Sequence, residues 1–171
     1  MDIFAHMLWT NVVYYKKYKD QLKDRLWAVF FGVAPDLVAF APATIYAILF
    51  GRGGHLMALA DSNFWPFAYA REAYNYSHSF MIFLGVFLLV TALRKGKAYW
   101  PLLGWALHIA IDLFTHPDFY RTPFLFPISS YHQPYGISWA ESKFMLVNYI
   151  LIAVFYVLIY KVWRRKAKIS N

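Results

Sequence analysis

Two histidines and one aspartate recur at four-residue intervals in the apolar stretch Tyr99–His116. They are His108, Asp112 and His116, and a helix places them on one face because 3.6 residues make a turn. Ionisable side chains inside such a stretch are costly unless they pair, bind an ion or line a polar cavity. Imidazole and carboxylate are ligands of Zn²⁺ and similar divalent cations, so the pattern indicates a metal site. A hydrogen-bonded polar contact between helices is the alternative.

Three more ionisable residues lie in apolar or aromatic segments: His6, Asp36 and His78. Pro35 disturbs helical hydrogen bonding just before Asp36, whose carboxylate is suited to coordinate a metal or to accept a proton from water. The alternatives are an aspartate paired with Arg71 or a tyrosine, and histidines with structural roles. The chain has no cysteine, so a metal site must use histidines and carboxylates. We predict catalytic roles for Asp36 and Asp112 within one set of metal ligands: His6, Asp36, His78, His108, Asp112 and His116.

The composition is that of an integral membrane protein. Hydrophobic residues make up 60% of the 171 residues and charged residues only 15%, against about 25% in a soluble domain. The aromatic content of 22% fits this class, because tyrosine and tryptophan favour membrane interfaces. The length suits one domain, so we expect residues 1–171 to form a single membrane-embedded unit.

The expected fold is an all-α helical bundle in a membrane. Each predicted transmembrane helix is an apolar stretch near or above the minimum of roughly 17 residues for a span. The segment Met1–Tyr15 is apolar but short, and the sequence leaves open whether it is a fifth span or a half-inserted helix. The four predicted transmembrane helices are Leu26–Phe50, His78–Leu93, Tyr99–His116 and Phe144–Trp163.

The net charge of +8 follows a topological pattern. By the positive-inside rule, clustered basic residues face the cytoplasm, which leaves the loops Gly51–Ser77 and Pro117–Ser142 outside. We expect a multi-pass protein of the cell (inner) membrane whose charge contacts anionic lipids. No nucleic-acid-binding motif is present, so we expect no nucleic-acid partner. The basic clusters are Lys16, Lys17, Lys19, Lys23 and Arg25; Arg94, Lys95 and Lys97; and Lys161, Arg164, Arg165, Lys166 and Lys168.

The same topology predicts that the polar residues meet at similar depths. At a rise of about 1.5 Å per residue, His6, Asp36 and His108 lie roughly 15–17 Å from their basic clusters, near mid-membrane. Asp112, His78 and His116 fall between about 22 and 28 Å by the same rise. The candidate site therefore faces the outer leaflet.

Ordered motifs run along the chain: His6, Pro35–Asp36, SHS around His78, GWxLHxxxDxxTH over Gly104–His116, LFPIS ending at Ser129, and GISW over Gly136–Trp139. Together these motifs resemble a family of small membrane-bound metal-dependent hydrolases. The resemblance covers most of the chain. The family itself is distantly similar to zinc-dependent phospholipase C and P1-type nucleases. It implies that Asp36, His78, His108 and Asp112 hold a principal zinc ion, and that His6 shares Asp112 to help a second. The later His-x-x-x-Glu pair of the soluble enzymes is absent, so one or two ions are implied.

We therefore expect a membrane-embedded hydrolase that cleaves a phosphate ester of a lipid or lipid-linked substrate through metal-activated water. Arg71 is a candidate partner for a substrate phosphate, and His132 is a candidate for the substrate entrance. Two other functions stay open from the sequence. One is a transport protein for divalent cations or protons, because intramembrane aspartate and histidine line such pathways. The other is a membrane adaptor with a structural metal site.

Overall fold

The computed structural model describes residues 1–18, 20–50, 64–117 and 120–169, with side chains up to residue 161. Every regular element in those ranges is a helix, which confirms the all-α class. Lys19, residues 51–63 of the predicted outer loop and the side chains of the C-terminal basic cluster beyond Lys161 lie outside the described residues.

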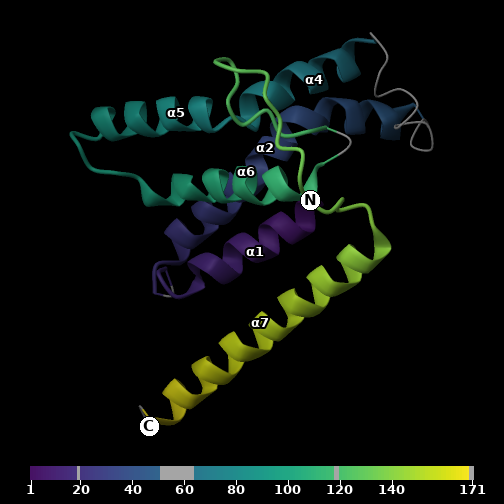
Figure 1. Ribbon diagram of the computed structural model, residues 1–171. Coiled ribbons are helices and arrows are strands. Elements are labelled where there is room, and N and C mark those ends of the chain that lie inside the picture. The colour runs from purple at the N-terminus through teal and green to yellow at the C-terminus, as the bar shows by residue number, and fades with distance from the viewer. Residues whose placement is uncertain (19, 51–63, 118–119, 170–171) are drawn as a thin grey trace.

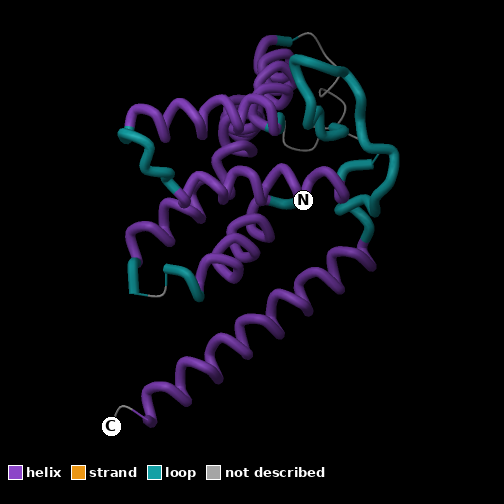
Figure 2. Tube along the Cα trace, turned by 60° about the vertical axis from the view of Figure 1, so that its left-hand side comes forward, coloured by secondary structure: helices purple, strands orange, loops and turns teal. Residues whose placement is uncertain are grey.

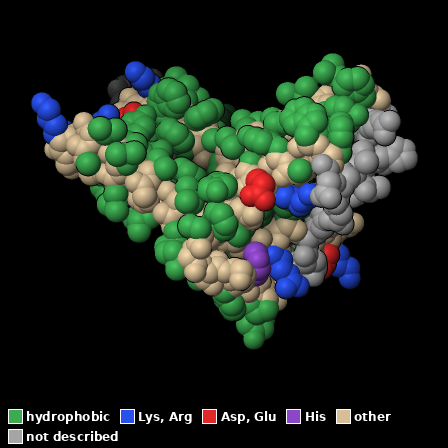
Figure 3. All heavy atoms as spheres, turned by 90° about the horizontal axis from the view of Figure 1, so that it is seen from above, with side chains coloured by type: hydrophobic (Ala, Val, Ile, Leu, Met, Phe, Trp, Pro, Cys, Tyr) green, Lys and Arg blue, Asp and Glu red, His purple; other side chains and the backbone are tan. Residues whose placement is uncertain are grey.

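Within the described ranges, two helices are long and apolar enough to cross a membrane. They are α2, Leu22–Leu49, and the apolar part Ser142–Lys161 of α7, Ser142–Ile169. A third candidate span is the pair α4, Trp65–Ser77, and α5, Phe80–Leu93, which meet at a bend of 63°. Hydrophobic side chains dominate the face seen from above (Figure 3), as expected for a membrane-associated surface.

Two segments differ from the sequence-based expectation. The stretch Trp100–Thr115 consists of a 3-10 turn, η2 (Trp100–Leu102), and α6 (Leu103–Thr115), and it is shorter than the candidate spans. Residues Trp65–Ser77, predicted as part of an outer loop, are helical, so that part of the prediction is wrong. Pro66 sits in the first turn of α4, where its missing N–H costs no helical hydrogen bond.

Helix α2 is the centre of the fold. The helix α1, Ile3–Tyr15, packs against α2, as do α4 and α6 (Figure 1). Pro35 and Pro42 both lie inside α2, yet the helix continues through them. Helix α7 contacts α1 and leans away from the other helices in both views (Figures 1 and 2). The candidate site therefore belongs to the α1, α2, α4 and α6 group.

Glycine allows α2 and α6 to approach closely. A Cβ atom at Gly104 of α6 would overlap the carbonyl oxygen of Ala28 and would lie 3.1 Å from the amide nitrogen of Gly32. One turn further along α6, His108 contacts the carbonyl oxygen of Gly32. The two helices thus run in the same direction, with their turns in register, up to the level of the candidate site.

We predict that Gly104→Ala destabilises the protein by about 1–3 kcal/mol, the usual effect of overpacking. The added methyl group meets the rigid backbone of α2 rather than a flexible side chain. The measurement is thermal or denaturant unfolding of the full chain in mixed micelles. Gly85→Ala on α5 is the control, because nothing lies within 4 Å of its added Cβ atom. Equal stability of the two variants would contradict the close contact between α2 and α6.

Candidate metal site

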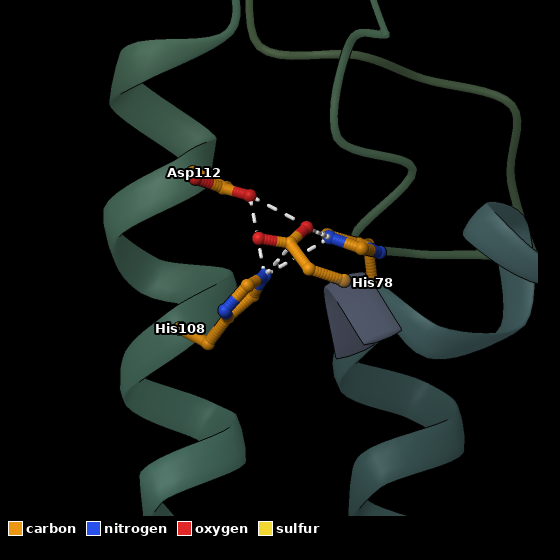
Figure 4. A group of neighbouring side chains, drawn as sticks. His78, His108 and Asp112 are labelled. Atoms are coloured by element: carbon orange, nitrogen blue, oxygen red, sulfur yellow. Dashed lines mark hydrogen bonds and ion pairs between the residues drawn. The ribbon is translucent and has the colours of Figure 1, made fainter. Parts of the chain in front are cut away.

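Four side chains from three parts of the chain converge on one point. Asp36 comes from α2, His78 from the bend between α4 and α5, and both His108 and Asp112 from α6. One ligand atom of each lies within 4.8 Å of the others. Figure 4 shows His78, His108 and Asp112 pointing toward one another, with His108 and Asp112 one turn apart on the same helix.

The distances between donor atoms fit a small cation with tetrahedral coordination. Bonds of about 2.0–2.1 Å to zinc imply a separation of roughly 3.3 Å between neighbouring ligand atoms. His78 Nε2 lies 3.5 Å from both Asp36 Oδ1 and Asp112 Oδ2. His108 Nε2 lies 3.7 Å from Asp36 Oδ1 and 3.3 Å from Asp112 Oδ2. The two Nε2 atoms are 3.0 Å apart. The side chains are therefore spaced as a metal site requires.

One carboxylate oxygen in the site makes no hydrogen bond and is available to a cation. Among the described residues, the buried Asp112 Oδ2 atom has no hydrogen-bond partner. A buried carboxylate oxygen without a partner is costly, and a bound cation would satisfy it. The residues present therefore fit a divalent ion.

A backbone carbonyl orients His108. Its Nδ1 atom lies 2.8 Å from the oxygen of Gly32, and a carbonyl only accepts, so Nδ1–H donates. In the neutral imidazole, Nε2 then carries the free lone pair and faces the other three side chains. A hydrogen bond from the second nitrogen is the usual way in which a metal-binding histidine is held.

The bend between α4 and α5 positions His78. Helix α4 ends at Ser77, and Ser79 starts α5 because its side chain accepts hydrogen bonds from the amides of Met81 and Ile82. The carbonyl freed at Ser77 accepts a hydrogen bond of 2.6 Å from the Trp105 indole. The hydroxyl group of Ser77 lies 2.9 Å from His78 Nδ1. His78 thus occupies a hydrogen-bonded break between two helices, with Nε2 directed at the site.

The second oxygen of Asp112 faces a different group of residues. Asp112 Oδ1 lies 2.9 Å from His6 Nε2 and 3.5 Å from His116 Nε2, and Thr115 Oγ1 donates a hydrogen bond to it over 3.3 Å. The amino group of Met1 contacts the same oxygen. The His6 ring also stacks on His108, with ring centroids 3.7 Å apart. Asp112 therefore joins the four-residue cluster to His6 and His116.

The side chain of Asp36 is more exposed to solvent than those of the other three members of the cluster. The side chains of His78, His108 and Asp112 are at most 1% exposed, whereas that of Asp36 is 12% exposed. Asp36 is thus the member of the cluster best placed to meet water or a ligand.

The structure brings together all six residues predicted as metal ligands. The two predicted substrate-binding residues lie elsewhere: Arg71 is on α4, two turns before His78, and His132 is in the segment after α6. Neither belongs to the four-residue cluster, and their roles stay predictions. Sequence reasoning missed the supporting groups, Gly32 and Trp105. Gly104, the first residue of the GWxLH motif, is the sequence signal for close helix packing.

Comparison with protein-family models, curated proteins and solved structures finds no match to this chain. The resemblance to membrane-bound metal-dependent hydrolases thus stays a prediction from the motifs.

We predict that the purified full chain in detergent binds zinc or a similar divalent cation, and that His108→Ala and Asp112→Ala each abolish binding. Each substitution removes one of the four ligand atoms that lie close together in the cluster. The measurement is elemental analysis after metal repletion. His132→Ala, outside the cluster, is the control and keeps the metal content of the wild type. Full metal content in both cluster variants would show that the metal binds elsewhere.

Proposed function

We propose that the protein is a membrane-embedded, metal-dependent hydrolase that cleaves a phosphate ester of a lipid or lipid-linked substrate. One observation carries the proposal: three buried donor side chains and one partly exposed carboxylate are directed at a single point. Catalytic zinc sites characteristically have three protein ligands and keep one position for water or substrate. His78, His108 and Asp112 supply such a set, and Asp36 lies beside the remaining position.

Each residue of the site has a separate role in the proposed reaction. His78, His108 and Asp112 would hold a divalent ion, zinc in our proposal, which would supply a water of lowered pKa, about 7, and would polarise a phosphoryl oxygen. Asp36 is the general base: its carboxylate orients the attacking water and accepts a proton from it. Gly32 holds His108 in the required tautomer through its carbonyl oxygen. His6 and His116, on the opposite oxygen of Asp112, hold that carboxylate in place or share it with a second ion.

The membrane setting defines the substrate class. In our proposal the chain is a four-span bundle of the cell (inner) membrane, with its basic loops in the cytoplasm and its site toward the outer leaflet. A site at that depth meets lipids or lipid-linked phosphates more readily than soluble esters. Arg71 would contact the phosphate as a hydrogen-bond donor, and His132 would lie at the entrance.

A structural metal site in a membrane adaptor is the second candidate. Four protein donors lie within 4.8 Å of one another, and a fully coordinated ion leaves no position for substrate. The two functions differ in what Asp36 does. As a fourth ligand it is needed to hold the ion, and as a general base it is needed only for turnover.

We predict that Asp36→Asn retains the metal but lowers the rate of phosphoester hydrolysis by roughly 10²–10⁴-fold, the usual contribution of a general base. The amide keeps the shape of the side chain and an oxygen donor, but it cannot accept the proton. The measurement is release of the phosphorylated head group from lipid phosphoesters by metal-loaded protein, followed by mass spectrometry.

Asp24→Asn is the matched control, because it makes the same chemical change three turns earlier on α2. It is expected to keep both the metal and the rate. Loss of the metal in Asp36→Asn, together with no hydrolysis by the wild type, would favour the structural site instead.

A further inference from the structure

A cavity lies beside the candidate metal site, between α1, α6 and the start of α7. Its volume is about 290 Å³, near the lower end of the range of small-molecule sites. Its lining residues are apolar except for Thr115 and Asn148. The full set is Met1, Trp9, Val13, Leu107, Ile111, Thr115, Phe144 and Asn148. We refer to these residues as the α1–α6–α7 groove. None of them is a predicted metal ligand.

Helix α6 connects the groove to the metal site. Leu107, Ile111 and Thr115 form a stripe that lines the groove, and each directly precedes one of the site histidines or Asp112 in the sequence. The stripe covers nine residues, and its first and last members are about 12 Å apart at the helical rise. Thr115 ends it, and its hydroxyl donates a hydrogen bond to Asp112 Oδ1. A molecule in the groove would thus have one end next to a proposed metal ligand.

One polar group in the groove lacks a partner. The Asn148 side chain is buried, with 5% exposure, and its Oδ1 atom accepts a hydrogen bond of 2.8 Å from Trp9 Nε1. That bond fixes the amide orientation and leaves Nδ2 as a donor. In the described part of the chain, Nδ2 has no hydrogen-bond partner. A buried donor of this kind needs an acceptor, so the ligand must carry an oxygen as well as apolar surface.

The surroundings of the groove identify the ligand. Helix α7 is a candidate span, and its apolar side chains are largely exposed. Leu146, Ile150 and Val154 are 48–64% exposed, as expected for contact with lipid chains. Membrane glycerolipids supply both features that the groove requires, because a hydrocarbon chain there is joined to an ester carbonyl.

We propose that the α1–α6–α7 groove binds one acyl chain of a membrane glycerolipid, with the ester carbonyl accepting a hydrogen bond from Asn148 Nδ2. The chain lies along Leu107 and Ile111, and the head group extends past Thr115 toward the metal site. The groove could bind a lipid whether or not the protein is a hydrolase. Only the identification of this lipid as the substrate rests on the proposed function, and it makes glycerolipids the substrate class.

The test uses the full chain in nanodiscs that contain a phosphatidylglycerol with a diazirine in one acyl chain. After illumination, mass spectrometry maps the label. We expect label on Ile111 and Thr115, which are less exposed than the lipid-facing residues of α5, such as Leu88. Asn148→Leu removes the donor at similar volume and is expected to lower labelling of the groove about fivefold, the effect of one lost hydrogen bond.

Leu107→Trp fills the groove and is expected to abolish labelling there, whereas Leu88→Trp on α5 is the control and leaves it unchanged. Helical content by circular dichroism identifies any variant that fails to fold. Label confined to exposed helix faces, or groove labelling equal in Asn148→Leu, Leu107→Trp and wild type, would overturn the inference.

Chelator-treated protein separates the two proposals. Acyl-chain binding needs no metal, so groove labelling is expected to persist after the metal is removed. Groove labelling without metal uptake or hydrolysis would leave the groove in place and reject the hydrolase. Metal-dependent hydrolysis without groove labelling would do the reverse.

Discussion

The site depends on the close approach of α2 and α6. Gly104 lets α6 reach the backbone of α2 at Ala28, and the next turn of α6 brings His108 to the carbonyl oxygen of Gly32. One turn further along each helix, Asp36 of α2 and Asp112 of α6 belong to the same cluster. A larger residue at the crossing would separate the helices and move the aspartates apart. The small residues Gly104 and Ala28 thus set the spacing of Asp112 and Asp36, which lie two turns further along the two helices.

The second requirement is a break at a defined position. His78 reaches the cluster because α4 ends just before it and α5 starts just after it, with a bend of 63° between them. Ser79 accepts hydrogen bonds from the free amides at the start of α5, and Trp105 of α6 donates to the freed carbonyl of Ser77. The Ser77 hydroxyl contacts the His78 ring itself. Helix α6 therefore provides two ligands and also fixes the position of a third. This explains how a short helix can organise the whole site.

The ionisable residues were predictable from the sequence because of where they lie. Histidine and aspartate are rare in apolar segments unless they have partners, so His6, Asp36, His78 and His108 could be singled out and their depths compared. The all-helical class followed from the same apolar stretches. The geometry was not predictable in the same way, because it depends on contacts between segments far apart in the chain. Spacing alone could not show that α4 is helical, that Gly32 orients His108, or that Asn148 faces a cavity.

The central claim is that His78, His108 and Asp112 bind one divalent cation, with the carboxylate of Asp36 beside it. X-ray absorption spectroscopy at the zinc edge, on purified protein stripped of metal and then given one equivalent of zinc, tests it most directly. The structure predicts a shell of nitrogen and oxygen atoms only, at about 2.0–2.1 Å, with the outer-shell scattering of two imidazole rings. A protein that takes up no zinc, or one whose zinc shell lacks imidazole, would contradict the claim.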